Sequence, residues 1–517
     1  MLKRFRLFAV ALMATGTLWA CSDNDPEPEP VPDKPTTTES YLTVESVSTE
    51  LVAAEGGEVT FTVKSDRVPT GTTDADWAKR KSSDRTGDVS TFVFTVNAND
   101  GDARQANVTF KAGQLTASAV IKQEAAPKVE PPTPPVVGDE NTSVGYARAL
   151  GLGWNLGNQF DASNNGVASE TAWGNPKTTQ QLFNKLVEAG ITSVRIPITW
   201  LGQFGEAPDY TINQAWLDRI AEVVGYAEQA GLRAIINIHH DGANSSNWLN
   251  VKDAATNPKL HASIKQQIKA IWTQIAQRFS DKGQFLMFES FNEIHDGGWG
   301  WGENRRDGGK QYGVLNEWNQ VFVDAVRATG GNNATRFLGV PGYCTNPDLT
   351  IEHFVKPTDT AEDRILVAVH YYDPNEFTLT AKFTEWGHTG SASKKATYGD
   401  ENDVKNTFER LANKFTKAGT GLYIGEFGCT TRSAARDELF RLYYLEYVAK
   451  AGHDKGFGMI LWDNGSRATG NEAHGYFDHA TGAFMSTKAQ KAIEAMVKAY
   501  SDADPSYTLD TVYNTAP

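Results

Sequence analysis

The sequence predicts two folded domains, an α/β domain built as a (β/α)8 TIM barrel and, before it, a small all-β immunoglobulin-like sandwich. Two patterns support this prediction. Between about residues 140 and 501, short continuous apolar runs alternate with helix-period segments, as expected for parallel strands buried on both faces and connected by helices. Over residues 41–125 apolar side chains instead recur at every second position, the pattern of strands with one buried face.

The bulk composition fits folded domains and a partner without strong charge. Of the 517 residues, 40% are hydrophobic and 22% are charged, which is typical of globular chains with real cores. The formal net charge of -14 argues against nucleic acid as a partner, because nucleic-acid binding depends on clustered Lys and Arg. The 13 Trp and 17 Tyr could stack on sugar rings, although most large aromatic side chains in any protein belong to its core. Composition therefore favours a neutral partner without identifying it.

The N-terminus has the features of an export signal. Three basic residues precede an apolar run over 7–20, which predicts a cleaved signal peptide over residues 1–20, too short to span a bilayer. The run ends in Leu18-Trp19-Ala20-Cys21, which resembles a bacterial lipobox. That resemblance implies that Cys21 becomes the lipidated first residue of the mature protein.

Two proline-rich stretches separate the parts of the chain. Residues 21–40 interleave acidic residues with prolines and are expected to form a flexible tether, because such a composition cannot bury a core. The acidic residues directly after Cys21 resemble the export signal of Bacteroidetes surface lipoproteins, which implies a lipid anchor in the outer membrane and a place on the cell surface. Residues 126–139 are expected to be a stiffer polyproline-type linker, and residues 504–517 a C-terminal tail.

Residues 41–125 are predicted to form the sandwich. Alternating apolar positions indicate strands with one buried face: Val59, Phe61, Val63, Phe92, Phe94, Val96, Val108, Phe110, Ala117, Ala119 and Ile121. Four further features resemble a BACON domain, a family often described as carbohydrate-associated. They are Asp76-Trp77, Asn97-Ala98-Asn99, Arg104 and the closing Val120-Ile121-Lys122-Gln123. Because no row of aromatic residues is committed to binding, we expect a spacer domain with Trp77 in its core.

Residues 140–503 are predicted to form the barrel. Eight apolar runs are candidate strands: 150–156, 193–198, 234–239, 285–292, 336–341, 365–371, 422–426 and 458–462. The segments between them carry helical periodicity, for example 180–189, 215–230, 260–279 and 438–451.

Polar side chains stand where the predicted strands end. In a barrel, the C-terminal ends of the strands share one face, which is where a solvent-filled cleft is expected. The polar or aromatic residues at these ends are Asn155, Asn158, Arg195, His239, His240, Asn292, Glu293, His370, Tyr372, Glu426 and Trp462. Glu293 and Glu426 end the fourth and seventh strands, and two facing carboxylates about 5 Å apart are what the cleavage of a glycosidic bond with retained configuration requires.

Six motifs at these positions resemble glycoside hydrolase family 5. They are Ser193-Val194-Arg195-Ile196-Pro197, Ile238-His239-His240, Phe291-Asn292-Glu293, His370-Tyr371-Tyr372, Gly425-Glu426-Phe427-Gly428 and Leu461-Trp462-Asp463, and they cover the whole barrel domain in order. The opening Gly153-Trp154-Asn155-Leu156-Gly157-Asn158 and the paired histidines are similar to subfamily 4, which is rich in endoglucanases and xyloglucanases.

The resemblance implies that Glu293 is the general acid/base and Glu426 the nucleophile. Glu293 must then hold its proton, so we expect its pKa to be raised, while Glu426 must stay ionised. Arg195 is expected beside Glu426, where its positive charge would keep that carboxylate ionised. Tyr372 can donate a hydrogen bond to the same carboxylate.

The remaining predicted site residues are expected to bind the substrate. Besides Arg195 and Tyr372, they are Asn155, His239, His240, Asn292, His370, Trp462, Trp299 and Trp301. The resemblance implies that Asn292 binds a sugar 2-hydroxyl, that the histidines orient sugar and carboxylates, and that Trp462 forms a stacking floor. Trp299 and Trp301, in the loop after the fourth strand, are candidates for outer sugar subsites, whereas Glu289 precedes the strand end and is expected to be structural.

No metal and no other cofactor is expected. Although His239-His240-Asp241 offers adjacent ligands, neighbouring strand residues point to opposite faces, and no third ligand stands at the usual zinc spacing. Cys344 and Cys429 could pair only if their α-carbons came within about 7 Å, and two free, inert thiols are the expectation.

The sequence therefore predicts a monomeric, surface-anchored, retaining endo-β-1,4-glucanase that binds a β-1,4-linked glucan polysaccharide. Xyloglucan is the first expectation for the substrate, with mixed-linkage glucan or amorphous cellulose next. Two alternatives remain open: a β-mannanase or xylanase on the same barrel, and a non-catalytic surface protein that captures glycan.

Overall fold

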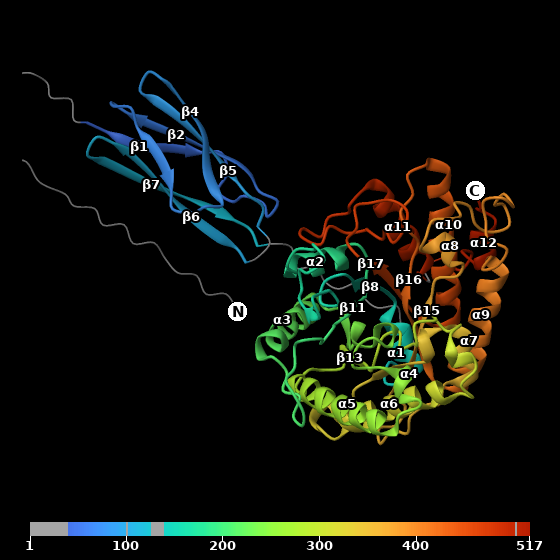
Figure 1. The fold of residues 1–517 in the computed structure, drawn as a ribbon. Coiled ribbons are helices and arrows are strands. Elements are labelled where there is room, and N and C mark those ends of the chain that lie inside the picture. Colours follow the sequence, from blue (N-terminus) through green and yellow to red (C-terminus); the bar gives the residue numbers. More distant parts are fainter. Residues whose placement is uncertain (1–39, 100–101, 126–138, 502–503) are drawn as a thin grey trace, which may run out of the picture. The chain divides into compact units, whose positions relative to one another are not determined.

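The computed structural model describes residues 40–99, 102–125, 139–501 and 504–517, which fall into two compact units (Figure 1). One unit contains the predicted sandwich and the other the predicted barrel. The predicted signal peptide, Cys21, the tether up to residue 39 and linker residues 126–138 lie outside the described residues.

The first unit is a sandwich of two antiparallel sheets, as predicted. One sheet has the order β1 (Leu42–Val47), β2 (Gly57–Ser65), β5 (Val89–Val96), β4 (Ala78–Thr86), and the other has the order β3 (Thr70–Thr73), β6 (Arg104–Ala112), β7 (Leu115–Gln123). The alternating apolar side chains predicted from β2, β5 and β6 are buried between the sheets. Trp77 packs against this core but is only partly buried, and the guanidinium of Arg104 lies 4.4 Å from its ring centroid.

The second unit is a closed barrel of eight parallel strands. Its strands, in order round the barrel, are β8 (Leu152–Leu156), β11 (Ser193–Ile196), β12 (Arg233–Asn237), β13 (Leu286–Glu289), β14 (Leu338–Pro341), β15 (Ile365–Tyr371), β16 (Gly421–Phe427) and β17 (Gly458–Asp463). All eight predicted strands are present. The fourth ends at Glu289 rather than at Asn292, so Asn292 and Glu293 belong to the loop that follows it.

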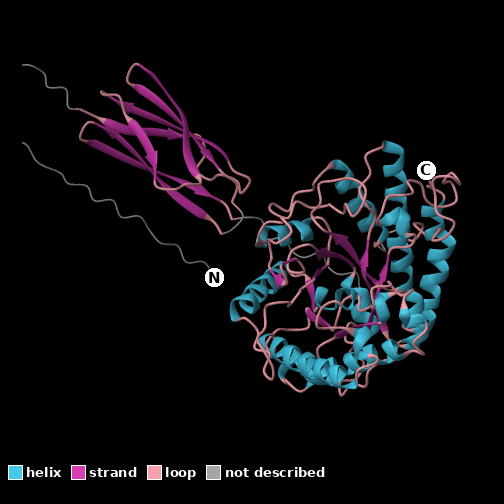
Figure 2. Ribbon diagram, viewed as in Figure 1, coloured by secondary structure: helices cyan, strands magenta, loops and turns pink. Residues whose placement is uncertain are grey.

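Helices surround the strands, as Figure 2 shows. They are α2 (Gln180–Glu188), α3 (Gln214–Ala230), α4 (Val251–Ala254), α5 (Pro258–Arg278), α6 (Lys310–Arg327), α7 (Pro347–His353), α8 (Asn375–Thr378), α9 (Glu401–Lys414), α10 (Ala435–Lys455) and α11 (Thr487–Ala499). Local sequence fixes their ends: α5, for example, starts at Pro258 after Asn257, whose side chain accepts a hydrogen bond from the Leu260 amide. Short 3-10 helices occupy His240–Ser245, Glu303–Arg305, Gly331–Ala334, Tyr343–Thr345 and Thr416–Ala418, and a two-stranded hairpin joins β9 (Ser163–Asn164) to β10 (Val167–Ala168).

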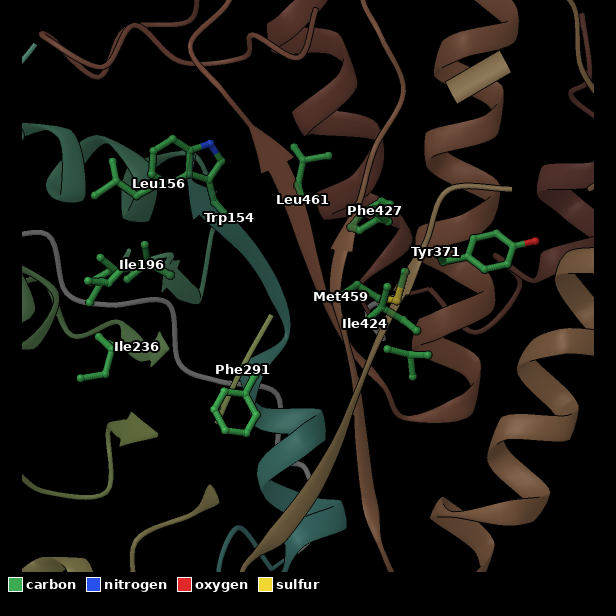
Figure 3. Packing of buried hydrophobic residues seen from close by; sticks show 14 of the residues in the cluster. Trp154, Leu156, Ile196, Ile236, Phe291, Tyr371, Ile424, Phe427, Met459 and Leu461 are labelled. Atoms are coloured by element: carbon green, nitrogen blue, oxygen red, sulfur yellow. The ribbon is translucent and has the colours of Figure 1, made fainter. Parts of the chain in front are cut away.

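Alternation along the strands divides the barrel into two apolar cores. Side chains that point outward pack against the surrounding helices, and Figure 3 shows several of them, including Trp154, Ile236 and Leu461. Side chains that point inward form a smaller cluster with α1 (Ser143–Leu150), which precedes β8. Its members are Tyr146, Ala147, Leu150, Ile235, Met287, Phe337, Leu366, Ala368, Tyr423 and Ile460. The interior is therefore packed, and the polar inward residues lie above this cluster.

One strand departs from regular pairing close to the predicted site. In β16, Ile424 pairs with Val369 and Glu426 with His370, so Gly425 is an extra residue without a partner in β15. Ile424 and Phe427 both belong to the outer core although they are three positions apart. A bulge of this kind changes the direction of the following side chain, and here it brings Glu426 to the interior face.

Residues 504–517, expected to be a tail, form part of the folded unit. They contain α12 (Leu509–Tyr513), whose Val512 is buried, and the ring of Tyr513 stacks on His388 with the centroids 4.0 Å apart. Within the described part of the chain, none of the helices has both the length and the apolar character needed to cross a membrane.

Candidate active site

A buried ion pair lies above the apolar cluster inside the barrel. Arg195 on β11 and Glu289 on β13 point inward, and neither side chain is exposed. Nη2 of Arg195 donates to Oε1 of Glu289 at 2.7 Å, and Nε donates to Oε2 at 3.0 Å. The Tyr423 hydroxyl donates to Oε2 at 2.8 Å and the Asn237 amide to Oε1 at 3.1 Å. Burial raises the pKa of Glu289, but Arg195 outweighs this effect and holds the pKa below its ordinary value.

The same guanidinium reaches the groups above it. Nη1 of Arg195 donates to Oε1 of Glu426 at 2.8 Å and to Oδ1 of Asn155 at 3.0 Å, while Nη2 also donates to Oδ1 of Asn292 at 2.7 Å. Arg195 therefore stands beside Glu426, as predicted. Arg195 and Asn155, predicted to bind substrate, are both fully buried and do not line the cleft; they lie beneath it, where Asn155 orients the guanidinium.

The two predicted carboxylates face one cleft of about 280 Å³. One oxygen of Glu293, one oxygen of Glu426 and a ring nitrogen of His370 all lie within 4.8 Å of one another. The described residues that line the cleft are His239, His240, Asn292, Glu293, Trp299, Cys344, Asn346, Pro347, His370, Tyr372, Asp373, Leu379, Glu426, Trp462 and Glu472. The structure thus brings most of the predicted site residues together.

The other predicted residues take definite places round the carboxylates. The Tyr372 hydroxyl donates to Oε2 of Glu426 at 3.2 Å, as expected, and Nδ1 of His370 lies 2.7 Å from Oε1 of Glu293. The rings of Trp462 and His239 are nearly parallel, with an interplanar angle of 6° and 6.1 Å between centroids. Nε2 of His240 lies 3.7 Å from Oδ2 of Asp161, a buried carboxylate that sequence reasoning missed.

The pKa directions of the two carboxylates are the reverse of those predicted. Burial raises the pKa of Glu293, but the hydrogen bond and charge of His370 outweigh it, so that this pKa lies below its ordinary value. Burial raises the pKa of Glu426 above its ordinary value despite His370 and Arg195. The physical reason is that Arg195 shares its charge with Glu289, a partner that the prediction did not assign to it.

The hydrogen bonds of His239 argue against metal binding. Asp161, His239 and His240 lie close enough to offer three ligand atoms. However, Oδ1 of Asn237 accepts the backbone N–H of Ile198, so its amide nitrogen, 3.2 Å from Nδ1 of His239, must donate to that ring nitrogen. The ring proton of His239 then sits on Nε2, which lies 4.0 Å from Glu426 and cannot ligate a metal in this form.

The two loop tryptophans differ in position. Trp299 is 57% exposed, lines the cleft and lies against His295 with the ring centroids 4.3 Å apart. Trp301 is 76% exposed and does not line the cleft; its ring covers the guanidinium of Arg305 at 4.6 Å, and its place at an outer sugar subsite stays a prediction. Trp173, 46% exposed, does not line the cleft itself, but its ring centroid lies 5.6 Å from that of His240, which does.

Both described cysteines are free and buried, as expected. Cys344 lines the cleft, where burial raises the pKa of its thiol well above the ordinary value. The thiol therefore stays protonated beside Glu293.

The barrel matches known proteins over most of its length. The family model described as "Cellulase (glycosyl hydrolase family 5)" matches residues 157–468. The chain belongs to glycoside hydrolase family 5. A BACON model, described as a putative binding domain, matches residues 67–124. The chain is thus a glycoside hydrolase with an N-terminal BACON domain.

Three relatives illustrate the similarity. Endoglucanase A of Paenibacillus barcinonensis is 38% identical over 65% of this chain and 84% of its own length. A structure titled "GH5-4 broad specificity endoglucanase from Bacteroides salanitronis" is 57% identical, with a TM-score of 0.69, and the match covers 71% of this chain and 97% of that one. A Bacteroides ovatus GH5 xyloglucanase, solved in complex with a XXXG heptasaccharide, is 30% identical, with a TM-score of 0.62, over 89% of this chain and 100% of that one.

The buried pair predicts a pH-dependent loss of stability on Glu289→Gln. Removing the negative charge leaves Arg195 with Glu426 as its remaining anion, and we expect a loss of roughly 3–5 kcal/mol at neutral pH. The folded-state pKa of Glu289 lies below the ordinary 4.5, so the stabilisation is fully present above about pH 4.5 and is lost as the pH falls further. Urea unfolding of the wild-type protein and of Glu289→Gln across this pH range measures the difference in their free energies of unfolding.

Glu317→Gln is the matched control. Glu317 is 56% exposed and pairs with Lys265 at 2.8 Å, so its substitution is expected to cost less than about 1 kcal/mol. Similar small losses for both variants would show that the buried pair adds no special stability.

Proposed function

We propose that this glycoside hydrolase is a retaining endo-β-1,4-glucanase that acts on plant β-glucans, with xyloglucan as its preferred substrate. The observation that carries this proposal is the separation of at most 4.8 Å between one oxygen of Glu293 and one of Glu426. Double displacement needs carboxylates about 5–5.5 Å apart, whereas inversion needs a wider gap to hold a water molecule.

The proposed reaction has two steps. First, the Glu426 carboxylate attacks the anomeric carbon, the bond from that carbon to the glycosidic oxygen breaks, and Glu293 gives its proton to the leaving oxygen. Then water attacks the anomeric carbon, Glu293 takes up a proton from that water, and the ester bond to Glu426 breaks. Both carboxylates are restored and the configuration is retained.

The surrounding residues prepare these steps. Arg195 and Tyr372 both hydrogen-bond Glu426, which fixes its orientation and stabilises its charged form when it leaves the sugar. Burial favours the protonated form of Glu293 that the first step requires, whereas the hydrogen bond and charge of His370 lower the pKa of this carboxyl.

Relatives support the choice of substrate. A relative from Bacteroides ovatus, 33% identical over 74% of this chain, is named a xyloglucan-specific endo-beta-1,4-glucanase, and the solved xyloglucanase of that organism spans 89% of the chain. Other relatives are named endoglucanases, and one similar structure is titled a lichenase. Amorphous cellulose and mixed-linkage glucan are therefore the substrates we propose after xyloglucan. Family membership and the facing carboxylates favour hydrolysis over glycan capture.

A panel of polysaccharides tests the substrate. We expect reducing ends to appear fastest from xyloglucan, more slowly from barley-type β-glucan and amorphous cellulose, and at background rate from mannan and xylan. Glu426→Ala, which lacks the nucleophile, should lose all of these activities. Faster release from mannan or xylan would replace the proposal with its mannanase or xylanase alternative, and no release from any glucan would overturn it.

The acid/base role of Glu293 predicts that its substitution slows the cleavage of the polymer more than that of a substrate with a good leaving group. Glu293→Ala should lower the rate on the polymer by roughly 10²–10⁴-fold, because the leaving oxygen needs a proton. An aryl cellobioside with a good leaving group needs none, so its first step should be largely retained. Equal losses on both substrates would contradict the assignment.

We further propose that the enzyme is anchored to the outer membrane through a lipid on Cys21. The support is the lipobox-like end of the signal peptide and the acidic residues after it. Cys21→Ala should release the protein from the membrane fraction, measured by fractionation of cells that express the full chain. A variant that stays with the membrane would contradict the anchor.

A further inference from the structure

A third carboxylate faces the cleft beside the two of the proposed mechanism. Glu472 lies in the loop after β17 and lines the cleft together with Glu293 and Glu426. The residue is exposed, but partial desolvation at the cleft raises its pKa, and the negative charges of Glu293 and Glu426 raise it further. Neither the family motifs nor the strand ends predicted this residue.

The backbone holds Glu472 in a conformation that side chains rarely adopt. Its φ is 54°, in the left-handed region, where a residue with a Cβ is strained. Its amide donates to the Leu379 carbonyl at 2.9 Å, and its carbonyl accepts the Asn464 side-chain amide at 2.7 Å. Strain of this kind persists where the surroundings impose it, and it is concentrated at functional sites.

The carboxylate of Glu472 has no polar partner among the described residues, since no hydrogen bond or ion pair reaches its side chain there. Glu289, by contrast, is held by Arg195, Tyr423 and Asn237. A carboxylate without a protein partner, held at the wall of a cleft, is free to accept hydrogen bonds from a ligand.

Apart from its histidines, the cleft is lined by ionisable groups of one sign, the carboxyl groups. Asp373 also lines it, which makes four carboxyl groups among the described lining residues, and these residues include no Lys or Arg. Arg195 lies beneath the cleft, where its charge is already shared by Glu289 and Glu426. A sugar chain that carries its own carboxylates meets unscreened negative charge at the wall, whereas neutral hydroxyls meet acceptors.

We propose that Glu472 is a specificity-determining residue that selects uncharged glucans: its carboxylate accepts hydrogen bonds from the hydroxyls of a sugar in the cleft and repels glucans substituted with carboxylates. This inference rests on the proposed function, namely that the cleft binds a β-1,4-glucan.

Two cellulose derivatives with the same backbone test the proposal. Carboxymethylcellulose carries charged substituents, and hydroxyethylcellulose carries neutral substituents of similar size. We expect Glu472→Gln to raise the ratio of kcat/KM on carboxymethylcellulose to that on hydroxyethylcellulose by about threefold to tenfold at low salt, through KM. High salt should raise the same ratio in the wild-type enzyme and should reduce the difference between the two proteins.

Two further variants separate charge in the cleft from other causes. Glu472→Asp keeps the charge and should keep the wild-type ratio. Glu494→Gln removes an exposed carboxylate on α11, outside the cleft, and should also leave the ratio unchanged. An unchanged ratio in Glu472→Gln, or the same rise in Glu494→Gln, would overturn the proposal. A wild-type protein that cleaves neither polymer would instead overturn the proposed function, and this inference with it.

Discussion

A single buried guanidinium connects the packed interior of the barrel to its cleft. Arg195 donates to Glu289 below and to Glu426 and Asn292 above, and none of its surface reaches solvent. Burying a charge is costly unless nearly every donor and lone pair around it is satisfied, and here Asn155, Asn237 and Tyr423 complete the set. The orientation of Glu426 is therefore fixed in part by a buried side chain that does not line the cleft.

The buried pair also explains why the acid–base balance of the site differs from the prediction. Sequence reasoning gave the whole positive charge of Arg195 to Glu426, but Glu289 takes up much of it. His370, 2.7 Å from Glu293 and 3.7 Å from Glu426, is the other source of charge in the cleft. The hydrogen bond of His370 acts against burial at Glu293, so this histidine helps to set the pKa of that carboxyl.

The barrel and the identity of its two carboxylates were predictable from the sequence for a simple reason. Strands buried on both faces are continuous apolar runs, and polar groups directly after them have few places to lie except the C-terminal face. The burial of Asn155 and the role of Glu289 were not predictable, because strand alternation does not show how deep a residue lies in the barrel. The places of Trp301 and Glu472 depend on the backbone of loops, which follow no repeating sequence pattern. The left-handed φ of Glu472 was not predictable either, because glutamate rarely adopts it.

The extra residue in β16 has a consequence for how the enzyme can change. Because the bulge at Gly425 turns the strand, the direction of Glu426 depends on this unpaired residue as well as on its neighbours. If Gly425 instead paired with His370 in regular alternation, the carboxylate of Glu426 would point toward the helices and Phe427 would point to the interior. Gly425 itself is confined, since a Cβ there would lie 3.1 Å from Nε2 of His370. Regular pairing of this strand would therefore remove one of the two facing carboxylates from the cleft.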